Sequence, residues 1–397
     1  MLNKQEQDIF LEILCSALWE REPNLSLFRG EWTWHNIVAA FDEHALLGVV
    51  ANTILGLPAD HLPDAQLQQF MMMKVANMMQ THLQHNSAIA TVFAEFEAAG
   101  CSPVLLKGQG LATLYPKGCV RANGDVDVYV GTACYEVAKQ IICTHADEDV
   151  AKHAIENEIE RHFKITTTDG IKFEVHRNAG EAANLLYNNV YLRTAAKCLL
   201  PENTATATLK LPEGEVVVRV PDMRCNVWHN LNHLVGHFGG EGIGLRQFCD
   251  WLLLVRQFTQ QATDEDYQQL RQALKQIGML HAWQVLGGIL VHQLQFPAKD
   301  FPFYSEKLAQ KSQGLVLQEV MSGGNFRFQS RERSSIPVPH GLRRIIRVAH
   351  NLHRTSKPLA VISDFYPYVY ICHSWMTGIR CHCERIVKKI RNNAPVN

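Results

Sequence analysis

Long apolar runs, internal repeats and low-complexity tracts are absent from this sequence. No stretch of about 18 consecutive apolar residues occurs among its 397 residues, and a membrane-spanning helix needs about 20. The N-terminal sequence MLNKQEQDIF lacks the basic region and the apolar run of a secretory signal peptide. We therefore expect a cytoplasmic protein with no membrane span.

Regular cysteine spacing is also absent. The 11 cysteines are an odd number, and most lie within apolar patterns, as Cys15 and Cys143 do. A disulfide framework is therefore not expected, and these thiols are typical of reduced core residues. Near the C-terminus, no zinc-site spacing fits the set Cys372, Cys381, His382 and Cys383.

Net charge is only −1, but the charges are unevenly distributed. Residues 1–100 contain 12 acidic and 4 basic side chains, whereas residues 327–397 contain 13 basic and 3 acidic ones. The basic end either complements the acidic end within the fold or receives a polyanion such as RNA. In the second case, Arg343, Arg344 and Arg347 on a predicted amphipathic helix are the expected contacts.

Composition is that of a globular protein, with 47% hydrophobic and 19% charged residues, and the length predicts subdomains. Residues 1–100 read as helical, with Thr33 capping a helix over residues 34–47 and a long helix over residues 64–99. Residues 101–222 are mixed α and β, and residues 223–397 are helical with a basic tail. Strands are predicted at 103–107, 124–130, 160–168, 171–177 and 215–220. The polar segment from Asn203 to Thr208 is predicted to be a loop.

The most informative segment, residues 103–130, combines an apolar strand, Lys107-Gly108, a short helix and a second strand. Because strand side chains alternate, Val126 and Val128 are expected in the core, with Asp125 and Asp127 together on the other face. Two such carboxylates repel each other unless a cation lies between them, and Mg²⁺ prefers hard oxygen ligands. This segment therefore predicts a metal-nucleotide site.

A third carboxylate is expected from residues 162–178. This segment reads as a β-hairpin turning at Asp169-Gly170. In its second strand, Phe173 and Val175 share one face, and Glu174 and His176 share the other. An ordinary amphipathic hairpin would show the same alternation. Considered together with Asp125 and Asp127, Glu174 is the third metal ligand that we predict.

These motifs resemble the uncharacterised nucleotidyltransferase family of the DNA polymerase β-like superfamily. The resemblance is carried by Leu106-Lys107-Gly108, Leu114-Tyr115-Pro116, Arg121, Asp125-Val126-Asp127 and Glu174-Val175-His176. Most of the superfamily has Gly-Gly or Gly-Ser where this chain has Lys107-Gly108, and the resembled family shares that departure. The fold implied is α+β, with a small mixed sheet flanked by N-terminal and C-terminal helical regions.

The resemblance also implies an activity: metal-dependent transfer of a nucleoside monophosphate from a nucleoside triphosphate to a hydroxyl, with release of pyrophosphate. Two Mg²⁺ (or Mn²⁺) ions about 4 Å apart would be held by Asp125, Asp127 and Glu174. The acceptor can be RNA, a protein or a small molecule. Two alternatives remain: a catalytically silent RNA- or protein-binding relative, and a phosphotransferase on the same fold.

Nucleotide contacts are expected from six residues, namely Lys107, Gly108, Arg121, His176, His237 and Arg246. His229, His233 and His237 recur every four residues and are expected to border the cleft, although such a stripe also occurs in zinc sites. Arg246 and Asp250 lie one helical turn apart, so an intrahelical ion pair and a nucleotide contact are both open.

Overall fold

The computed structural model describes residues 2–158, 162–183, 185–239 and 243–323, together with 358 and 360–362. Its helices are α1 (Lys4–Trp19), α2 (Trp34–Glu43), α3 (Leu47–Leu55), α4 (Ala65–Ala98), α5 (Gln109–Ala112), α6 (Gly131–Cys143), α7 (Glu148–Glu156), α8 (Asn188–Cys198), α9 (Met223–Gly239), α10 (Leu245–Gln261), α11 (Asp264–Gln276), α12 (Leu280–His292), α13 (Glu306–Ala309) and α14 (Leu315–Gly323). Short 3₁₀ turns are η1 (Leu25–Leu27), η2 (Ala59–His61), η3 (Leu185–Tyr187), η4 (Pro201–Asn203) and η5 (Gln310–Gln313).

A mixed four-stranded sheet carries the predicted motifs. Its strands are β1 (Val104–Leu105), β2 (Val126–Tyr129), β3 (His162–Thr166) and β4 (Lys172–His176). They lie in the order β1-β2-β4-β3, in which the central pair β2 and β4 is parallel and both outer pairs are antiparallel. This sheet and the surrounding helices confirm the predicted α+β class.

The two faces of the sheet differ as the alternation predicts. Val126, Val128, Phe173 and Val175 are all buried in a core that they share with α4 and α6. The other face carries the polar side chains of the same strands, because successive residues point in opposite directions. The acidic residues therefore lie on the face away from α4.

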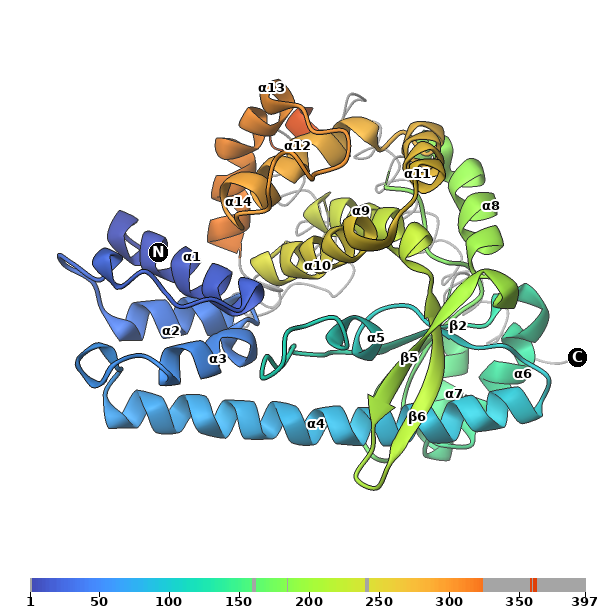
Figure 1. Cartoon of the computed structure of the whole chain (residues 1–397). Coiled ribbons are helices and arrows are strands. Elements are labelled where there is room, and N and C mark those ends of the chain that lie inside the picture. Colours follow the sequence, from blue (N-terminus) through green and yellow to red (C-terminus); the bar gives the residue numbers. More distant parts are fainter. Residues whose placement is uncertain are drawn as a thin grey trace, which may run out of the picture.

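A separate two-stranded ribbon corrects one prediction. Thr204–Lys210 forms β5 and pairs antiparallel with β6, Glu215–Pro221, so the segment from Asn203 to Thr208 is not a loop. Its alternating threonines are β-branched and suit a strand, once a partner strand later in the chain supplies the hydrogen bonds. In Figure 1 this ribbon crosses the long helix α4.

Local signals fix several helix starts. The Asn3 side chain accepts a hydrogen bond from the backbone N–H of Glu6, and the Glu6 carboxylate accepts one from Asn3. Thr33 caps α2 and Asp64 caps α4, which confirms both predicted starts. The predicted helix over residues 34–47 is wrong in its length. It ends early because Ala45 adopts a left-handed φ of 55°, and α3 follows as a separate helix.

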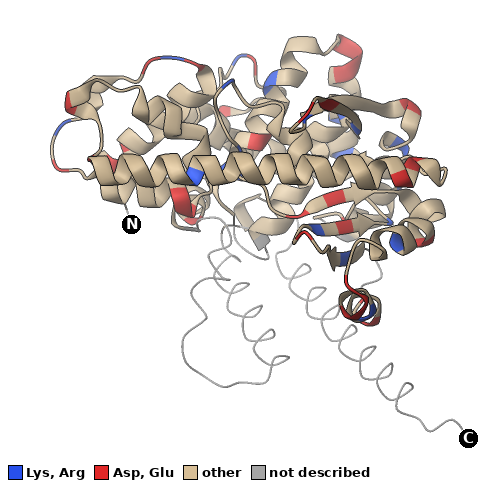
Figure 2. Cartoon of the chain, turned by 90° about the horizontal axis from the view of Figure 1, so that it is seen from below, with Lys and Arg blue, Asp and Glu red and all other residues tan. Residues whose placement is uncertain are grey.

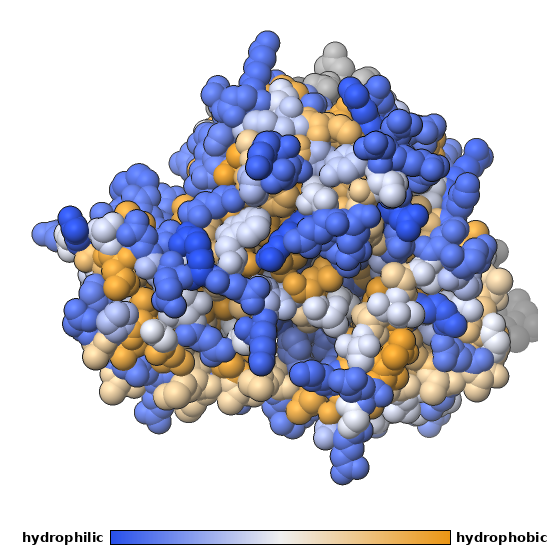
Figure 3. Space-filling model, in the orientation of Figure 1, coloured by the Kyte–Doolittle hydropathy of each residue, from blue (hydrophilic) through white to orange (hydrophobic). Residues whose placement is uncertain are grey.

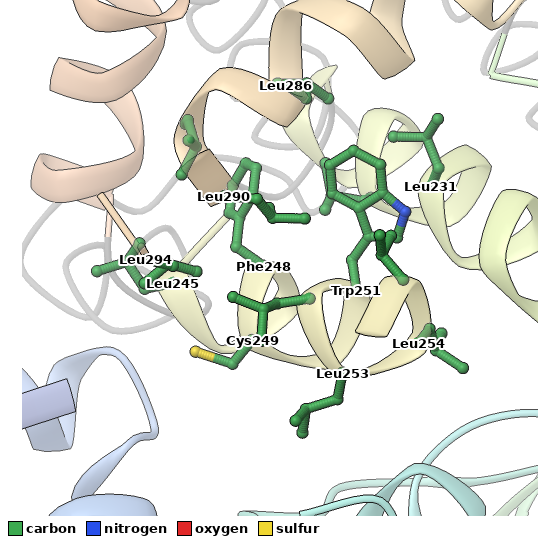
Figure 4. Close-up of a cluster of buried hydrophobic side chains, with 14 of the residues drawn as sticks. Leu231, Leu245, Phe248, Cys249, Trp251, Leu253, Leu254, Leu286, Leu290 and Leu294 are labelled. Carbon is green, nitrogen blue, oxygen red and sulfur yellow. The ribbon is translucent and has the colours of Figure 1, made fainter. Parts of the chain in front are cut away.

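Helices from the two ends of the described chain share one core. The indole N–H of Trp19 in α1 donates to the carbonyl of Leu294, just after α12, at 2.7 Å. Figure 4 shows the centre of this core, where Phe248 and Trp251 of α10 lie near Leu286 and Leu290 of α12. The limits of the three predicted regions stay a prediction.

The surface is mostly polar. Charged residues are scattered over the ribbon in Figure 2, and the face seen in Figure 3 has only small apolar patches. Among the described residues, no helix has the length and apolarity needed to cross a membrane. The predicted contacts Arg343, Arg344 and Arg347 lie outside the described residues, as does the cysteine-histidine set at residues 372–383.

Candidate active site

Two of the predicted acids lie opposite each other at the centre of the sheet. Asp127 of β2 pairs in register with Glu174 of the parallel strand β4. His176 lies two residues further along β4 and therefore on the same face. One ligand atom from each of Asp127, Glu174 and His176 lies within 4.8 Å of the others. These three side chains form a group with the spacing of metal ligands.

Lysine and histidine side chains contact the two carboxylates of this group. Lys107 Nζ and His176 Nε2 each lie 3.0 Å from Asp127 Oδ1. Lys164 on β3 forms an ion pair with Glu174 Oε1. Burial would raise the pKa of Asp127, but the Lys107 charge and the His176 hydrogen bond outweigh burial and hold this pKa well below its usual range. Asp127 is therefore a carboxylate at neutral pH.

Asp125 lies at the edge of this arrangement. It precedes β2, its side chain is exposed, and it lines a pocket together with Glu174. Partial desolvation by the surrounding protein, followed by the negative charge of Glu174, raises the pKa of Asp125. The structure thus brings Asp127 and Glu174 together with His176 as the third donor, and Asp125 stays a predicted ligand beside them.

Lys107 and Gly108 lie where β1 ends and α5 begins. Gly108 has φ +55° and ψ −114°, a conformation that essentially only glycine adopts without strain. The turn directs Lys107 toward Asp127 on one side and α9 on the other, where His233 Nε2 lies 3.3 Å from Lys107 Nζ. His233 therefore lies beside Lys107, next to the acids, and a contact between the histidine stripe and the substrate stays a prediction.

Of the histidines of α9, His229 is buried, whereas His233 and His237 are partly buried. His237 Nε2 lies 2.9 Å from His233 Nε2. Burial, followed by the charge of Lys107, lowers the pKa of His237 to about 4 and also lowers that of His233. His229, one turn earlier, instead contacts the Tyr191 hydroxyl through Nδ1 at 2.9 Å.

Arg121 belongs to a buried ion pair. Its Nε and Nη2 lie 2.7 and 2.8 Å from the two carboxylate oxygens of Asp250, and Tyr115 donates its hydroxyl to the same carboxylate at 2.8 Å. Nη1 donates to the Ala122 carbonyl and to the side chain of Asn123. The guanidinium that we expected to contact the nucleotide therefore connects the segment before β2 to α10.

Arg246 lies near this pair without joining it. Its Nη1 donates to the Ala122 carbonyl at 2.6 Å, whereas its buried Nε has no hydrogen-bond partner among the residues that the structure describes. Burial, and then the charge of Arg121, lowers the pKa of Arg246 to about 10. Asp250 makes its ion pair with Arg121, so the intrahelical pair with Arg246 is not formed by direct contact in the described structure.

Sequence reasoning missed His162. It lies on β3 directly opposite His176, and its ring centroid is 5.2 Å from that of His176. Its Nε2 is 4.0 Å from Glu174 Oε2 and has no hydrogen-bond partner within the part of the chain that the structure describes. The hairpin register counted back from Asp169-Gly170 would have placed His162 here.

Comparison with known proteins identifies the family. A family model described as "Uncharacterised nucleotidyltransferase" matches residues 30–294. The chain belongs to this family. The matched range contains every site residue named above, from Lys107 to Asp250. Neither the curated proteins nor the solved structures provide a match.

Membership in the family agrees with the geometry of the site. The fold is an α+β nucleotidyltransferase fold, and its sheet presents a cluster of acidic residues and histidine able to hold a divalent metal ion. Nucleotidyl transfer is the general activity that the family name states. The donor set fits a hard divalent cation, because two of the three side chains are carboxylates.

Proposed function

We propose that this protein is a metal-dependent nucleotidyltransferase that moves a nucleoside monophosphate from a nucleoside triphosphate to an acceptor hydroxyl, releasing pyrophosphate. The observation that carries the proposal is the group formed by Asp127, Glu174 and His176, with Lys107 against Asp127. In this group, side chains that can bind a metal lie beside the positive charge of Lys107, which is followed directly by the turn at Gly108.

The metal would be held by Asp127 and Glu174, with His176 or Asp125 as a further ligand. Carboxylate oxygens suit Mg²⁺, and an imidazole nitrogen is better tolerated by Mn²⁺. When bound, the divalent ion supplies neutralisation of phosphate charge and activation of the attacking hydroxyl.

The triphosphate would lie on the Lys107 side of Asp127. The Gly108 turn leaves room for phosphate oxygens, because the nearest atom that a Cβ there would meet is the Asp125 carbonyl at 3.8 Å. Lys107 would exchange part of its contact with Asp127 for the phosphates and stabilise the leaving pyrophosphate. Arg246, whose Nε has no partner among the described residues, and His237 on α9 are the further nucleotide contacts that we propose.

The test compares Asp127→Asn and Glu174→Gln with the control Asp147→Asn, which changes an exposed acid at the start of α7. Each protein is incubated with α-labelled nucleoside triphosphates, Mg²⁺ or Mn²⁺ and cell extract. Pyrophosphate release and label transfer should fall more than about 100-fold in the two site variants and remain unchanged in the control. Mn²⁺ affinity, measured by electron paramagnetic resonance, should fall in parallel.

Other products would reject the proposal. Release of a nucleoside diphosphate would identify a phosphotransferase. RNA or protein binding without any turnover would identify a silent relative. Undiminished Mn²⁺ affinity and pyrophosphate release in Asp127→Asn would remove Asp127 from the mechanism.

A further inference from the structure

A pocket of about 320 Å³ lies on the side of Glu174 that faces away from Lys107. Its walls are α7 and the strands β3 and β4, and Asp125 and Glu174 are among its lining residues. A volume of about 300 Å³ is at the lower end of the range for pockets that enclose small ligands. No residue of this pocket except Asp125 and Glu174 is used by the function proposed above.

The strand order gives the pocket its place in the reaction. β1, with Lys107 and Gly108 after it, lies on one side of β2, whereas β3 lies on the other side of β4. In nucleotidyl transfer the attacking oxygen and the leaving pyrophosphate lie in line, on opposite sides of the α-phosphorus. If the triphosphate lies against Lys107, the acceptor must approach from the β3 side, where the pocket opens. This step rests on the proposed function.

Two groups in the pocket are suited to an acceptor. His162 offers a buried Nε2 that has no hydrogen-bond partner among the described residues and lies 4.0 Å from Glu174 Oε2, within reach of a hydroxyl bound at Glu174. Lys164 of β3 and Lys172 of the neighbouring strand β4 carry positive charge on the same polar face. Lys164 lies opposite Glu174 in the register, two residues along β4 from Lys172. Lys164 is paired with Glu174, but Lys172 is exposed, with no ion pair among the described residues.

The outer wall of the pocket, α7, is weakly buried by the described residues. α7 buries none of its nine residues, and its Val150 is 38% exposed although it lines the pocket. An RNA end would need an extended basic groove with aromatic stacking platforms. The described walls instead offer two lysines, two histidines and one buried aromatic ring, that of Phe173.

We propose that this pocket binds the acceptor, and that the acceptor is a small phosphorylated alcohol. Its phosphate would lie against Lys172 and Lys164. Its hydroxyl would lie at Glu174, where His162 orients it by a hydrogen bond. In the reaction the hydroxyl oxygen forms the new bond to the α-phosphorus, the bond to the pyrophosphate oxygen breaks, and the hydroxyl proton is lost to solvent or to a site carboxylate.

The binding test uses radiolabelled inorganic phosphate as the probe, in equilibrium dialysis with saturating Mg²⁺ and α,β-methylene ATP. The variant is Lys172→Glu, and the matched control is Lys152→Glu, an exposed lysine on α7 that does not line the pocket. Phosphate affinity should fall about tenfold or more in Lys172→Glu, the loss expected for one charge-assisted contact, and should be unchanged in the control. Affinity for the nucleotide analogue should be equal in all three proteins.

The turnover test uses the dialysable fraction of a cell extract as the acceptor source, with and without prior phosphatase treatment. Label should appear in small products, and phosphatase treatment should abolish it. His162→Ala should raise the KM for this fraction several-fold without changing affinity for the analogue. Label in RNA or protein, or label that survives phosphatase treatment, would overturn the proposal.

The two proposals fail in different ways. If the wild type does not bind the nucleotide analogue or release pyrophosphate, the proposed function is wrong. If it does both, but phosphate binding is absent, is unaffected by Lys172→Glu or is lost when the analogue binds, only the acceptor pocket is wrong.

Discussion

Replacing Asp250 by asparagine should severely destabilise the protein. The Asp250 carboxylate is buried and accepts hydrogen bonds from Arg121 and Tyr115. The substitution keeps the shape of the side chain but removes its charge, so the buried guanidinium of Arg121 loses its counter-ion. Arg246, close by, adds a second positive charge.

Breaking a buried ion pair from one side costs about 3–5 kcal/mol, because an uncompensated charge stays in the interior. Native proteins have unfolding free energies of only about 5–15 kcal/mol, so this loss is a large fraction of the total. Removing both charges, as in Arg121→Met with Asp250→Leu, should recover at least half of the loss. Tyr115→Phe alone should cost about 1 kcal/mol.

The assay is urea unfolding followed by tryptophan fluorescence, since Trp251 adjoins Asp250 and its ring lies 5.2 Å from that of Trp283. Equal losses in Asp250→Asn and in the double variant would refute the buried-pair argument. An Arg121→Met variant with unchanged unfolding free energy and weakened nucleotide binding would also refute it, and would restore Arg121 as a nucleotide ligand.

The pH dependence of the unfolding free energy provides an independent check of the role of Asp250. Burial would raise the pKa of Asp250, but the charge and hydrogen bonds of Arg121 outweigh burial and lower it. A carboxyl whose pKa is lower in the folded protein stabilises the fold above its unfolded pKa of about 3.9 and loses that contribution as the pH falls. The stability difference between wild type and Asp250→Asn should therefore be constant above about pH 5 and shrink in stronger acid.

Two further substitutions test the backbone geometry. Gly108→Ala should cost about 1–3 kcal/mol, because alanine strains at φ +55°, and should weaken triphosphate binding; calorimetry that detects neither effect would contradict the assigned turn. Gly288→Ala should lower the melting temperature, because its Cβ would lie 2.2 Å from the Ala309 carbonyl oxygen. A Cβ at Gly236 in α9 would meet no atom of the described residues within 4 Å, so Gly236→Ala should be neutral or stabilising. Equal melting temperatures in these two variants would refute the close approach of α12 to α13.

The part of the site that follows from local alternation was predictable. Val126 and Val128 are buried and Asp127 faces the other way, because strand geometry alone fixes the two faces. The hairpin turn at Asp169-Gly170 likewise places Glu174, once the register is counted. The same hairpin register also places His162 opposite His176.

Long-range partners were not predictable in this way. Arg121 and Asp250 are 129 residues apart in the chain, so no spacing rule indicates that they meet. The polar residues from Asn203 to Thr208, taken alone, predict a loop. They form a strand because β6, later in the chain, provides partners for their backbone hydrogen bonds. The break between α2 and α3 depends on the left-handed backbone conformation of Ala45, and an alanine gives no sequence signal for that conformation.

The charges on the polar face bear on how the proposed metal and the nucleotide would bind together. Lys107 and His176 already compensate the buried charge of Asp127, so the strand is not destabilised by an unpaired carboxylate. If Asp127 and Glu174 held a divalent ion, that ion would repel the Lys107 ammonium, and Lys107 would then contact the triphosphate. Metal and nucleotide binding are therefore expected to favour each other. The measurement is the Mn²⁺ affinity proposed above, repeated with and without α,β-methylene ATP. Equal Mn²⁺ affinities in the two conditions would show that Lys107 stays on Asp127.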